Sequence, residues 1–389
     1  MSLTEPDSVF DTQDRRFMRL ALHVARRILG QTAPNPAVGA VIADETTGEV
    51  VARGWTQTSG RPHAEAHALA AAGESAQGKT MYVTLEPCSY HGRTYPRIGK
   101  KLPCAEAILA ADMRRVVVAT EDPNPEIAGR GVEVLRSAGV TVDIGLCGDE
   151  ARWVAAGHIL RMTEARPLVQ LKIAVSGDGL IAPGEGAPVW VTGPDLRAYA
   201  HLLRARVDAV LVGRQTVEDD DPELTCRLPG LANRSPRRVI LDSTFRISPA
   251  LKVFQTANRV PIIIFGTVAG TPPRYPSGVE TRFVACGVDG RLSLRAVLRS
   301  LADDGVTRVL VEAGPTIAAA FLAEDLADEV VIGHGTASLG AGGRKPFAER
   351  GLEVLDDPGR WRLVVDRGLS GDRLTIHRRT GRFSGKAAP

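Results

Sequence analysis

Runs of apolar residues alternate with helical patterns through the first half of the chain. At residues 17–28, apolar positions recur at helical spacing, which predicts a helix that buries one face. Short runs of β-forming residues then predict strands at 38–43, 50–53, 80–85, 115–119 and 140–144. Further helices are predicted at 63–72, at 104–111 and over a stretch that ends at 138. This alternation predicts a three-layer α/β domain.

The second half shows the same alternation after a polar stretch at residues 163–167. Strands are predicted at 167–175, 208–213, 238–242, 260–265, 308–312 and 329–333. Helices are predicted at 194–206, 293–303 and 316–323, and a closing β pair at 362–366 and 373–377. We therefore assign a first domain to residues 12–150, a connecting helix and linker to 151–166, and a second domain to 167–380.

Composition narrows the class of protein. The 389 residues suggest two or three domains, and 48 basic against 45 acidic residues give no field that would recruit nucleic acid or an anionic membrane. No apolar run approaches the ~20 residues of a membrane span, and the N-terminus lacks a signal pattern. Five scattered cysteines suggest a reducing compartment. We expect a cytoplasmic protein that binds neither nucleic acid nor membranes; whether it forms a homo-oligomer stays open.

Residues 61–104 have the spacing of a metal site. His63 and Glu65 stand in H-A-E, and Cys88 and Cys104 each follow a proline. One imidazole and two thiolates suit zinc and leave a fourth position for water, while a carboxylic acid that is not a ligand can carry protons. We predict that His63, Cys88 and Cys104 hold one zinc ion per chain and that Glu65 is the proton shuttle.

Two other interpretations of this stretch compete with a zinc deaminase site. Zinc proteases need a glutamate directly after the first histidine, where this chain has Ala64, so His67 is predicted to be an ordinary helix residue. The histidine and two cysteines could also be a surface imidazole and two core thiols. The remaining Cys147, Cys226 and Cys286 lack a partner motif and are predicted to be buried thiols.

In the second half, an apolar strand, a Gly-Pro turn and a helix start follow one another at residues 309–316. Free backbone N–H groups at such a helix start can hold a phosphate, although the same pattern is often only a turn. The acidic run at 219–221 is by itself typical of a solvated loop.

The order of the motifs is similar to that of the bifunctional riboflavin-biosynthesis deaminase/reductase family. The first half contains P-N-P-A-V-G, H-A-E, L-E-P-C-S, H-G-R-T, D-P-N-P and A-G-R-G. The second contains L-K-I-A-V-S-G-D-G, W-V-T, L-R-A-R, T-V-E-D-D-D-P-E-L-T-C-R and V-E-A-G-P-T. The resemblance implies a cytidine-deaminase-like N-terminal domain and a dihydrofolate-reductase-like C-terminal domain.

The resemblance also implies two successive reactions. The first domain would use zinc to remove the 2-amino group of 2,5-diamino-6-ribosylamino-4(3H)-pyrimidinone 5′-phosphate by hydrolysis. The second would use NADPH to reduce the ribosyl side chain to ribityl. The only partners implied are this small pyrimidine ribose phosphate and the cofactor.

Individual roles follow from the same resemblance. In the deaminase half, the substrate would contact Asn35, Arg93 and Asn124. In the reductase half, Lys172 and Asp220 would be catalytic, and the substrate would contact Arg204, Leu224, Arg227 and Glu312. The cofactor would contact Val175, Trp190, Thr216, Asp220, Ser243, Gly314, Pro315 and Thr316. Pro188 stands where the family more often has a small polar residue.

One departure concerns the metal site. Fifteen residues separate Cys88 from Cys104, more than in the family, and Arg97 stands where the second thiol would fall without a gap. Tyr90 also replaces a histidine. Because Cys104 is followed by the expected helix, we predict an inserted loop, which costs little entropy. The alternative is a reductase with a degenerate, metal-free deaminase domain.

Two rivals come from other classes. A nucleic-acid-binding deaminase would need a basic stripe with interleaved aromatic residues, which the sequence lacks. A sensor that binds a flavin precursor without turnover would not oxidise NADPH when given the substrate.

Overall fold

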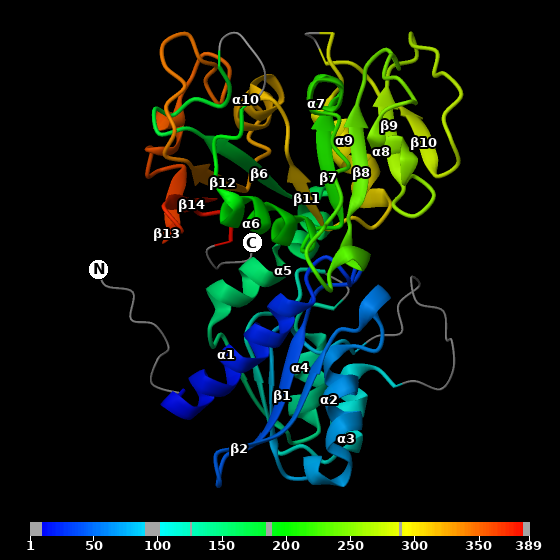
Figure 1. Ribbon diagram of the computed structural model, residues 1–389. Helices are drawn as coiled ribbons and strands as arrows, with labels where there is room; N and C mark the ends of the chain where they lie inside the picture. Colours follow the sequence, from blue (N-terminus) through cyan, green and yellow to red (C-terminus); the bar gives the residue numbers. More distant parts are fainter. Residues whose placement is uncertain (1–9, 90–101, 125–126, 184–188, 288–289, 384–389) are drawn as a thin grey trace. The chain divides into compact units, whose positions relative to one another are not determined.

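The computed structural model describes residues 10–89, 102–124, 127–183, 189–287 and 290–383 (Figure 1). The chain divides into two compact units. Unit 1 consists of two segments, one that ends at Ala165 and one that begins at Phe383, whereas unit 2 comprises Arg166–Arg382. Both units mix helices and strands, which confirms the predicted α/β class.

Unit 1 is built on a five-stranded sheet of order β2-β1-β3-β4-β5. Strand β1 pairs antiparallel with β2 and β3, whereas β3, β4 and β5 run parallel. The strands are β1 (Gly39–Asp44), β2 (Glu49–Trp55), β3 (Thr80–Val83), β4 (Arg115–Val118) and β5 (Thr141–Ile144). The carboxyl ends of β3 and β4 therefore meet at one edge of the sheet.

Helices cover both faces of this sheet, as the sequence pattern predicts. Val41, Tyr82 and Val117 face one apolar cluster with α1 (Thr12–Arg27) and α5 (Gly148–Glu164). The alternate strand residues face a second cluster with α2 (Ala64–Ala72), α3 (Cys104–Ala110) and α4 (Arg130–Ser137). Period-two alternation along the strands produces this division. Short 3₁₀ turns lie at η1 (Thr58–Gly60) and η2 (Gly73–Ala76).

Unit 2 contains a nine-stranded sheet of order β10-β9-β8-β7-β11-β6-β12-β14-β13 within its described residues. The strands from β10 to β12 in this order are parallel, and β14 and β13 add antiparallel at one edge. They are β6 (Leu168–Val175), β7 (Ala209–Gly213), β8 (Arg237–Leu241), β9 (Ile262–Gly266), β10 (Val279–Phe283), β11 (Arg308–Val311), β12 (Glu329–His334), β13 (Trp361–Leu369) and β14 (Asp372–Arg379).

Three apolar clusters cover the two faces of this sheet. On one face, α9 (Leu294–Asp303) and α10 (Pro315–Ala323) pack on the strands. On the other lie α6 (Pro194–Arg204), α7 (Arg214–Asp220) and α8 (Lys252–Gln255). Two 3₁₀ turns, η3 (Ala232–Arg234) and η4 (Leu352–Leu355), complete the unit. Of all these helices, none in the described part of the chain is long and apolar enough to cross a membrane.

Three local expectations are corrected. Asp219 and Asp220 lie in the last turn of α7 and not in a loop, and Asp221 caps that helix. Strand β10 was not foreseen, because its charged residues hide the strand pattern of an edge strand. Cys286 is exposed and Cys147 half-buried, whereas Cys226 is buried as predicted.

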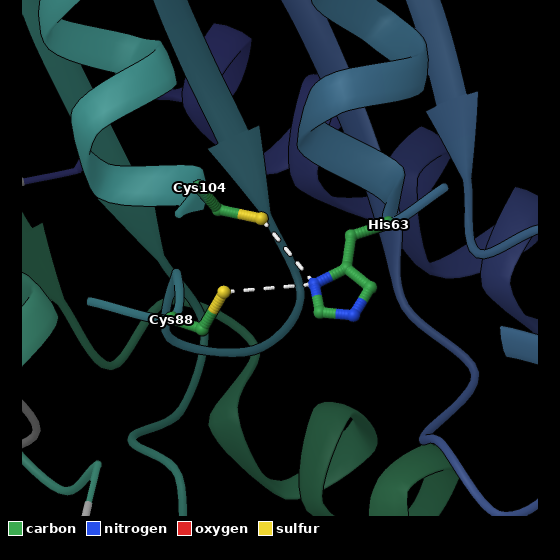
Figure 2. A group of neighbouring side chains, drawn as sticks. All are labelled: His63, Cys88 and Cys104. Carbon is green, nitrogen blue, oxygen red and sulfur yellow. Dashed lines mark hydrogen bonds between the residues drawn. The ribbon is translucent and has the colours of Figure 1, made fainter. Parts of the chain in front are cut away.

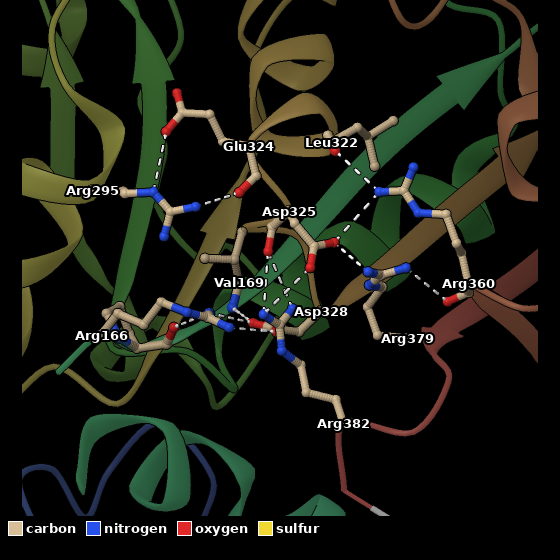
Figure 3. Close-up of polar contacts among 11 residues, drawn as sticks. Arg166, Val169, Arg295, Leu322, Glu324, Asp325, Asp328, Arg360, Arg379 and Arg382 are labelled. Carbon is tan, nitrogen blue, oxygen red and sulfur yellow. Dashed lines mark hydrogen bonds and ion pairs between the residues drawn. The ribbon is translucent and has the colours of Figure 1, made fainter. Parts of the chain in front are cut away.

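One buried carboxylate holds both ends of unit 2 (Figure 3). Asp328, with no exposed surface, accepts hydrogen bonds from Arg166 at 2.7 and 2.9 Å and pairs with Arg382 at 3.0 Å. The same carboxylate accepts the Val169 backbone N–H at 2.9 Å. The residues at which the chain enters and leaves this unit are thus bound to one side chain.

Candidate active sites

The three predicted metal ligands come together in unit 1 (Figure 2). His63 is the N-cap of α2, Cys88 follows β3, and Cys104 is the first residue of α3. One donor atom from each lies within 4.8 Å of the others. Nδ1 of His63 is 3.3 Å from the Cys104 Sγ and 3.6 Å from the Cys88 Sγ. The long stretch between the two thiols therefore does not keep Cys104 out of the site.

This donor set fits zinc. One imidazole nitrogen and two sulfurs make three protein ligands, which leaves one position of a tetrahedral ion open. A hydrogen bond with Cys104 and the neighbouring His63 lower the pKa of Cys88 to about 4, so its thiolate is favoured before any ion binds. The Cys88 carbonyl accepts the Ala105 N–H at 3.0 Å, which fixes the loop against the start of α3.

Glu65 lies beside these ligands in the first turn of α2. Its side chain is buried, and burial raises its pKa to about 7, with His63 acting in the opposite direction and Cys88 adding to the rise. A carboxylic acid with such a pKa can both give and take a proton near neutral pH.

His67 is engaged elsewhere. Its Nδ1 lies 2.9 Å from the Gln57 Nε2 and accepts the Trp55 N–H at 3.3 Å. The ring also packs edge-on against the Trp55 ring. His67 therefore links α2 to the end of β2, in keeping with the helix role expected for it.

The segment that follows β4 contacts the metal-ligand loop through Glu86. This buried carboxylate accepts four backbone N–H groups from residues 122–132. Asn124 donates its N–H to the Asp122 Oδ1 at 2.9 Å, and His158 on α5 faces the same oxygen at 3.3 Å. Of the predicted substrate contacts, Asn124 lies here, Asn35 is buried beside Gly60, and Arg93 lies outside the described residues.

In unit 2, three predicted residues form a charged group: Lys172 lies within β6, Arg204 ends α6, and Glu312 directly follows β11. Arg204 donates to both oxygens of Glu312, at 2.7 and 2.8 Å, and their side chains are only 12% and 13% exposed. Burial opposes ionisation of Glu312, but Arg204 and Lys172 outweigh it and lower the pKa. Burial lowers the pKa of Lys172, with Glu312 acting in the opposite direction. A lysine of this kind lies next to an anionic partner and can release a proton more readily than a solvated one.

The chain segment after α7 packs against the same arginine. The Thr225 carbonyl accepts from Arg204 at 3.1 Å and lies 3.1 Å from the His201 Nδ1. Arg227 donates its backbone N–H to His201 at 3.4 Å and pairs its side chain with an exposed glutamate. Leu224 is buried with a positive φ of 57°. Four predicted substrate contacts therefore share one neighbourhood.

Six of the eight predicted cofactor contacts lie at, or just after, the carboxyl ends of parallel strands, where α/β sheets bind their ligands. Gly314, Pro315 and Thr316 begin α10 after β11, and a Cβ on Gly314 would come 4.0 Å from the Thr216 hydroxyl. Ser243 follows β8, and Val175 ends β6 with its carbonyl bonded to Gly335 at 2.7 Å. The remaining two are exposed: Trp190, with Arg197 over its ring, and Asp220, near Arg344.

The chain is similar to known proteins in both sequence and structure. A profile of the RibD C-terminal domain matches residues 167–365, and one of the cytidine and deoxycytidylate deaminase zinc-binding region matches residues 11–120. The riboflavin biosynthesis protein RibD of Escherichia coli K12 is 38% identical over 371 residues, which cover 92% of this chain and 98% of that one. The RibD of Aquifex aeolicus is 38% identical over 366 residues, 94% of this chain and 98% of its own.

The chain belongs to the RibD family. Solved structures agree with the assignment. The deaminase/reductase of Thermotoga maritima has a TM-score of 0.81 at 35% identity, covering 94% of this chain and 99% of that one. Acinetobacter baumannii RibD has a TM-score of 0.79 at 35% identity, covering 95% and 99%.

Membership of the RibD family makes the chain a bifunctional enzyme of riboflavin biosynthesis, with a cytidine-deaminase-like N-terminal domain and a C-terminal reductase domain. The alternative of a reductase with a metal-free first domain is not favoured, since the three donor atoms lie together. Sequence reasoning missed Glu86, His158 and His201. Their partners are largely backbone groups distant in sequence, and no motif signals such contacts.

Proposed function

We propose that this RibD-family enzyme first deaminates 2,5-diamino-6-ribosylamino-4(3H)-pyrimidinone 5′-phosphate and then reduces its ribosyl group to ribityl with NADPH. The observation that carries the proposal is the group of His63, Cys88 and Cys104 with buried Glu65 beside it. The Thermotoga maritima relative is named a diaminohydroxyphosphoribosylaminopyrimidine deaminase and 5-amino-6-(5-phosphoribosylamino)uracil reductase, which supports the choice of substrates.

In the deaminase unit, His63, Cys88 and Cys104 would hold one zinc ion. When bound, zinc acidifies a water molecule so that it can act as a nucleophile near neutral pH. Glu65 takes a proton from the attacking water and passes it to the ring nitrogen next to the attacked carbon. Glu65 then moves the second proton of the same water to the amine. The amine leaves as ammonia, and a carbonyl remains. Asn35, Asn124 and Arg93 are proposed to hold the pyrimidine ribose phosphate.

In the reductase unit, Arg204, Glu312, Leu224 and Arg227 would bind the phosphorylated substrate. NADPH supplies the hydride, so the protein contributes position and charge. Lys172, held near Glu312, and Asp220 are the proposed proton-transfer and polar groups. Val175, Trp190, Thr216, Ser243 and the α10 start at 314–316 are the proposed cofactor contacts.

Two assays on the full-length enzyme test this proposal. Ammonia should be released from the diaminopyrimidine substrate, and a chelator should stop the release. NADPH should be oxidised when the deaminated product is supplied directly, with or without the chelator. NADPH oxidation without any ammonia release would leave a reductase alone, and the absence of both would refute the proposal.

A further inference from the structure

The loop that carries Cys88 and the segment that begins at Asp122 lie at the same edge of the unit 1 sheet. Strands β3 and β4 are parallel neighbours, so their carboxyl ends meet there. Glu86 donates its backbone N–H to the Thr120 carbonyl at 3.0 Å, which continues the pairing past the ends of both strands. In open α/β sheets, ligands bind in the crevice outside these ends. The segment after β4 therefore forms a wall next to the metal ligands.

The Glu86 carboxylate holds that wall by hydrogen bonds to each of its two oxygens. One oxygen accepts the N–H groups of Asp122 at 3.2 Å and Gly129 at 3.0 Å. The other accepts those of Gly131 at 2.9 Å and Val132 at 3.4 Å, at the start of α4. Both oxygens are thus occupied by backbone donors, and the side chain is buried. Glu86 is therefore suited neither to bind a metal nor to exchange protons with a substrate.

Close packing couples the wall to the ligand loop as well. A Cβ added to Gly131 would lie 2.0 Å from the carbonyl oxygen of Pro87, the residue just before Cys88. No side chain fits between α4 and this peptide. A change in the position of residues 127–131 would therefore displace the peptide next to Cys88.

We propose that Glu86 is a positioning residue for the deamination reaction. Its carboxylate sets the distance between the metal-ligand loop and the wall that begins at Asp122, and so fixes where the pyrimidine ribose phosphate lies relative to Cys88 and Glu65. The inference rests on the proposed function. It adds a residue that touches neither the substrate nor the metal.

Glu86→Gln tests the proposal in the full-length enzyme. The amide has nearly the same shape, but its NH2 group would face two backbone N–H donors, so half of the ties are lost. Because the wall holds the substrate before and during reaction, the KM for deamination should rise about tenfold, with kcat lowered less than about threefold. Zinc content should stay at one per chain, and NADPH oxidation with the deaminated product should not change.

Glu133→Gln is the matched control, since Glu133 is exposed on α4 and carries the same chemical change. It should behave as the wild type. Gly131→Ala provides a second route that keeps the carboxylate itself, because its methyl group would lie 2.0 Å from the Pro87 carbonyl oxygen and 3.2 Å from a Glu86 oxygen and so pushes α4 away from both. It should raise the KM in the same way, and it decides the matter if Glu86→Gln does not fold.

The proposal is overturned if KM stays within about twofold of wild type while only thermal stability falls, because Glu86 is then merely structural. It is also overturned if zinc is lost in proportion to activity, because Glu86 then acts on metal binding. A wild-type enzyme that releases no ammonia would instead refute the proposed function, and the inference with it.

Discussion

The two candidate sites of this chain differ in whether their polar side chains pair with one another. In the deaminase unit, one imidazole nitrogen and two sulfurs converge, and the Nε2 of His63 is buried without a hydrogen-bond partner among the described residues. In the reductase unit, the charged groups already satisfy one another, since both oxygens of Glu312 accept from Arg204. The first site brings together donors that suit a metal ion, whereas the second contains an ion pair that is already closed.

The difference predicts how each site fails. Removing one donor from the deaminase site removes the ion and therefore the reaction, while the fold keeps its apolar core. Removing one partner from the reductase pair leaves a buried charge uncompensated, which costs stability as well as binding. Metal dependence and ion-pair dependence should therefore separate cleanly within one polypeptide.

The largest effect is expected for Cys104→Ser. A serine hydroxyl is a poor zinc ligand, so the ion should be lost and deamination should fall about 10⁴-fold or more. Elemental analysis should give about one zinc per wild-type chain and almost none in the variant, with NADPH oxidation unchanged. Zinc retained by the variant would point to another third ligand, with His91, which lies outside the described residues, the first to examine.

Glu65→Gln should produce the next largest effect and sharpen the distinction between holding the ion and moving protons. Zinc should remain bound, because Glu65 is not one of the three donors. Deamination should fall about 10³-fold, within the range typical of a lost general acid–base. Single-turnover ammonia release measures the step directly. A variant with wild-type kcat would exclude Glu65 as the shuttle.

Glu312→Gln probes the reductase framework. The variant leaves Arg204 without its buried partner, so unit 2 should lose about 3 kcal/mol of unfolding free energy, and NADPH-dependent reduction should weaken. Denaturant unfolding measures the loss. Glu280→Gln is the control, because Glu280 is 56% exposed in its pair with Arg282 and should cost less than about 1 kcal/mol. Equal losses in the two variants would contradict the distinction between buried and exposed pairs.

The smallest effect concerns pH. The folded-state pKa of Glu312 is lowered from the usual 4.5, so the folded protein holds this carboxylate ionised more firmly than the unfolded chain does. Its contribution is present above pH 4.5 and is lost as pH falls through the lower folded value. The stability gap between wild type and Glu312→Gln should narrow from pH 7 toward acid. A gap that widened on acidification would reverse the assigned sign.

The sequence predicts most readily those features whose chemistry depends on residue type. His63, Cys88 and Cys104 could be foreseen because few other sets of side chains bind zinc, and the α/β alternation because apolar periodicity reports burial. Asp219 and Asp220 could not be placed, since an acidic run suits a helix end as well as a loop.

The role of Glu86 could not be predicted from the sequence for another reason. Its partners are backbone N–H groups between 36 and 46 positions further along the chain, and every residue type except proline carries such a group. The roles of Asn124, Trp190 and Val175 came from family resemblance and stay predictions. Arg93 lies outside the described residues.

The shared carboxylate of Asp328 has a consequence for the gene. Arg166 and Arg382 open and close the reductase unit, and both bind this one side chain (Figure 3). When the first and last residues of a domain lie close together, the domain can be inserted into a loop of another protein without distorting either of the two. We therefore expect that the gene segment encoding this unit can be inserted into another coding sequence as one piece, because both ends of the encoded domain bind the same side chain.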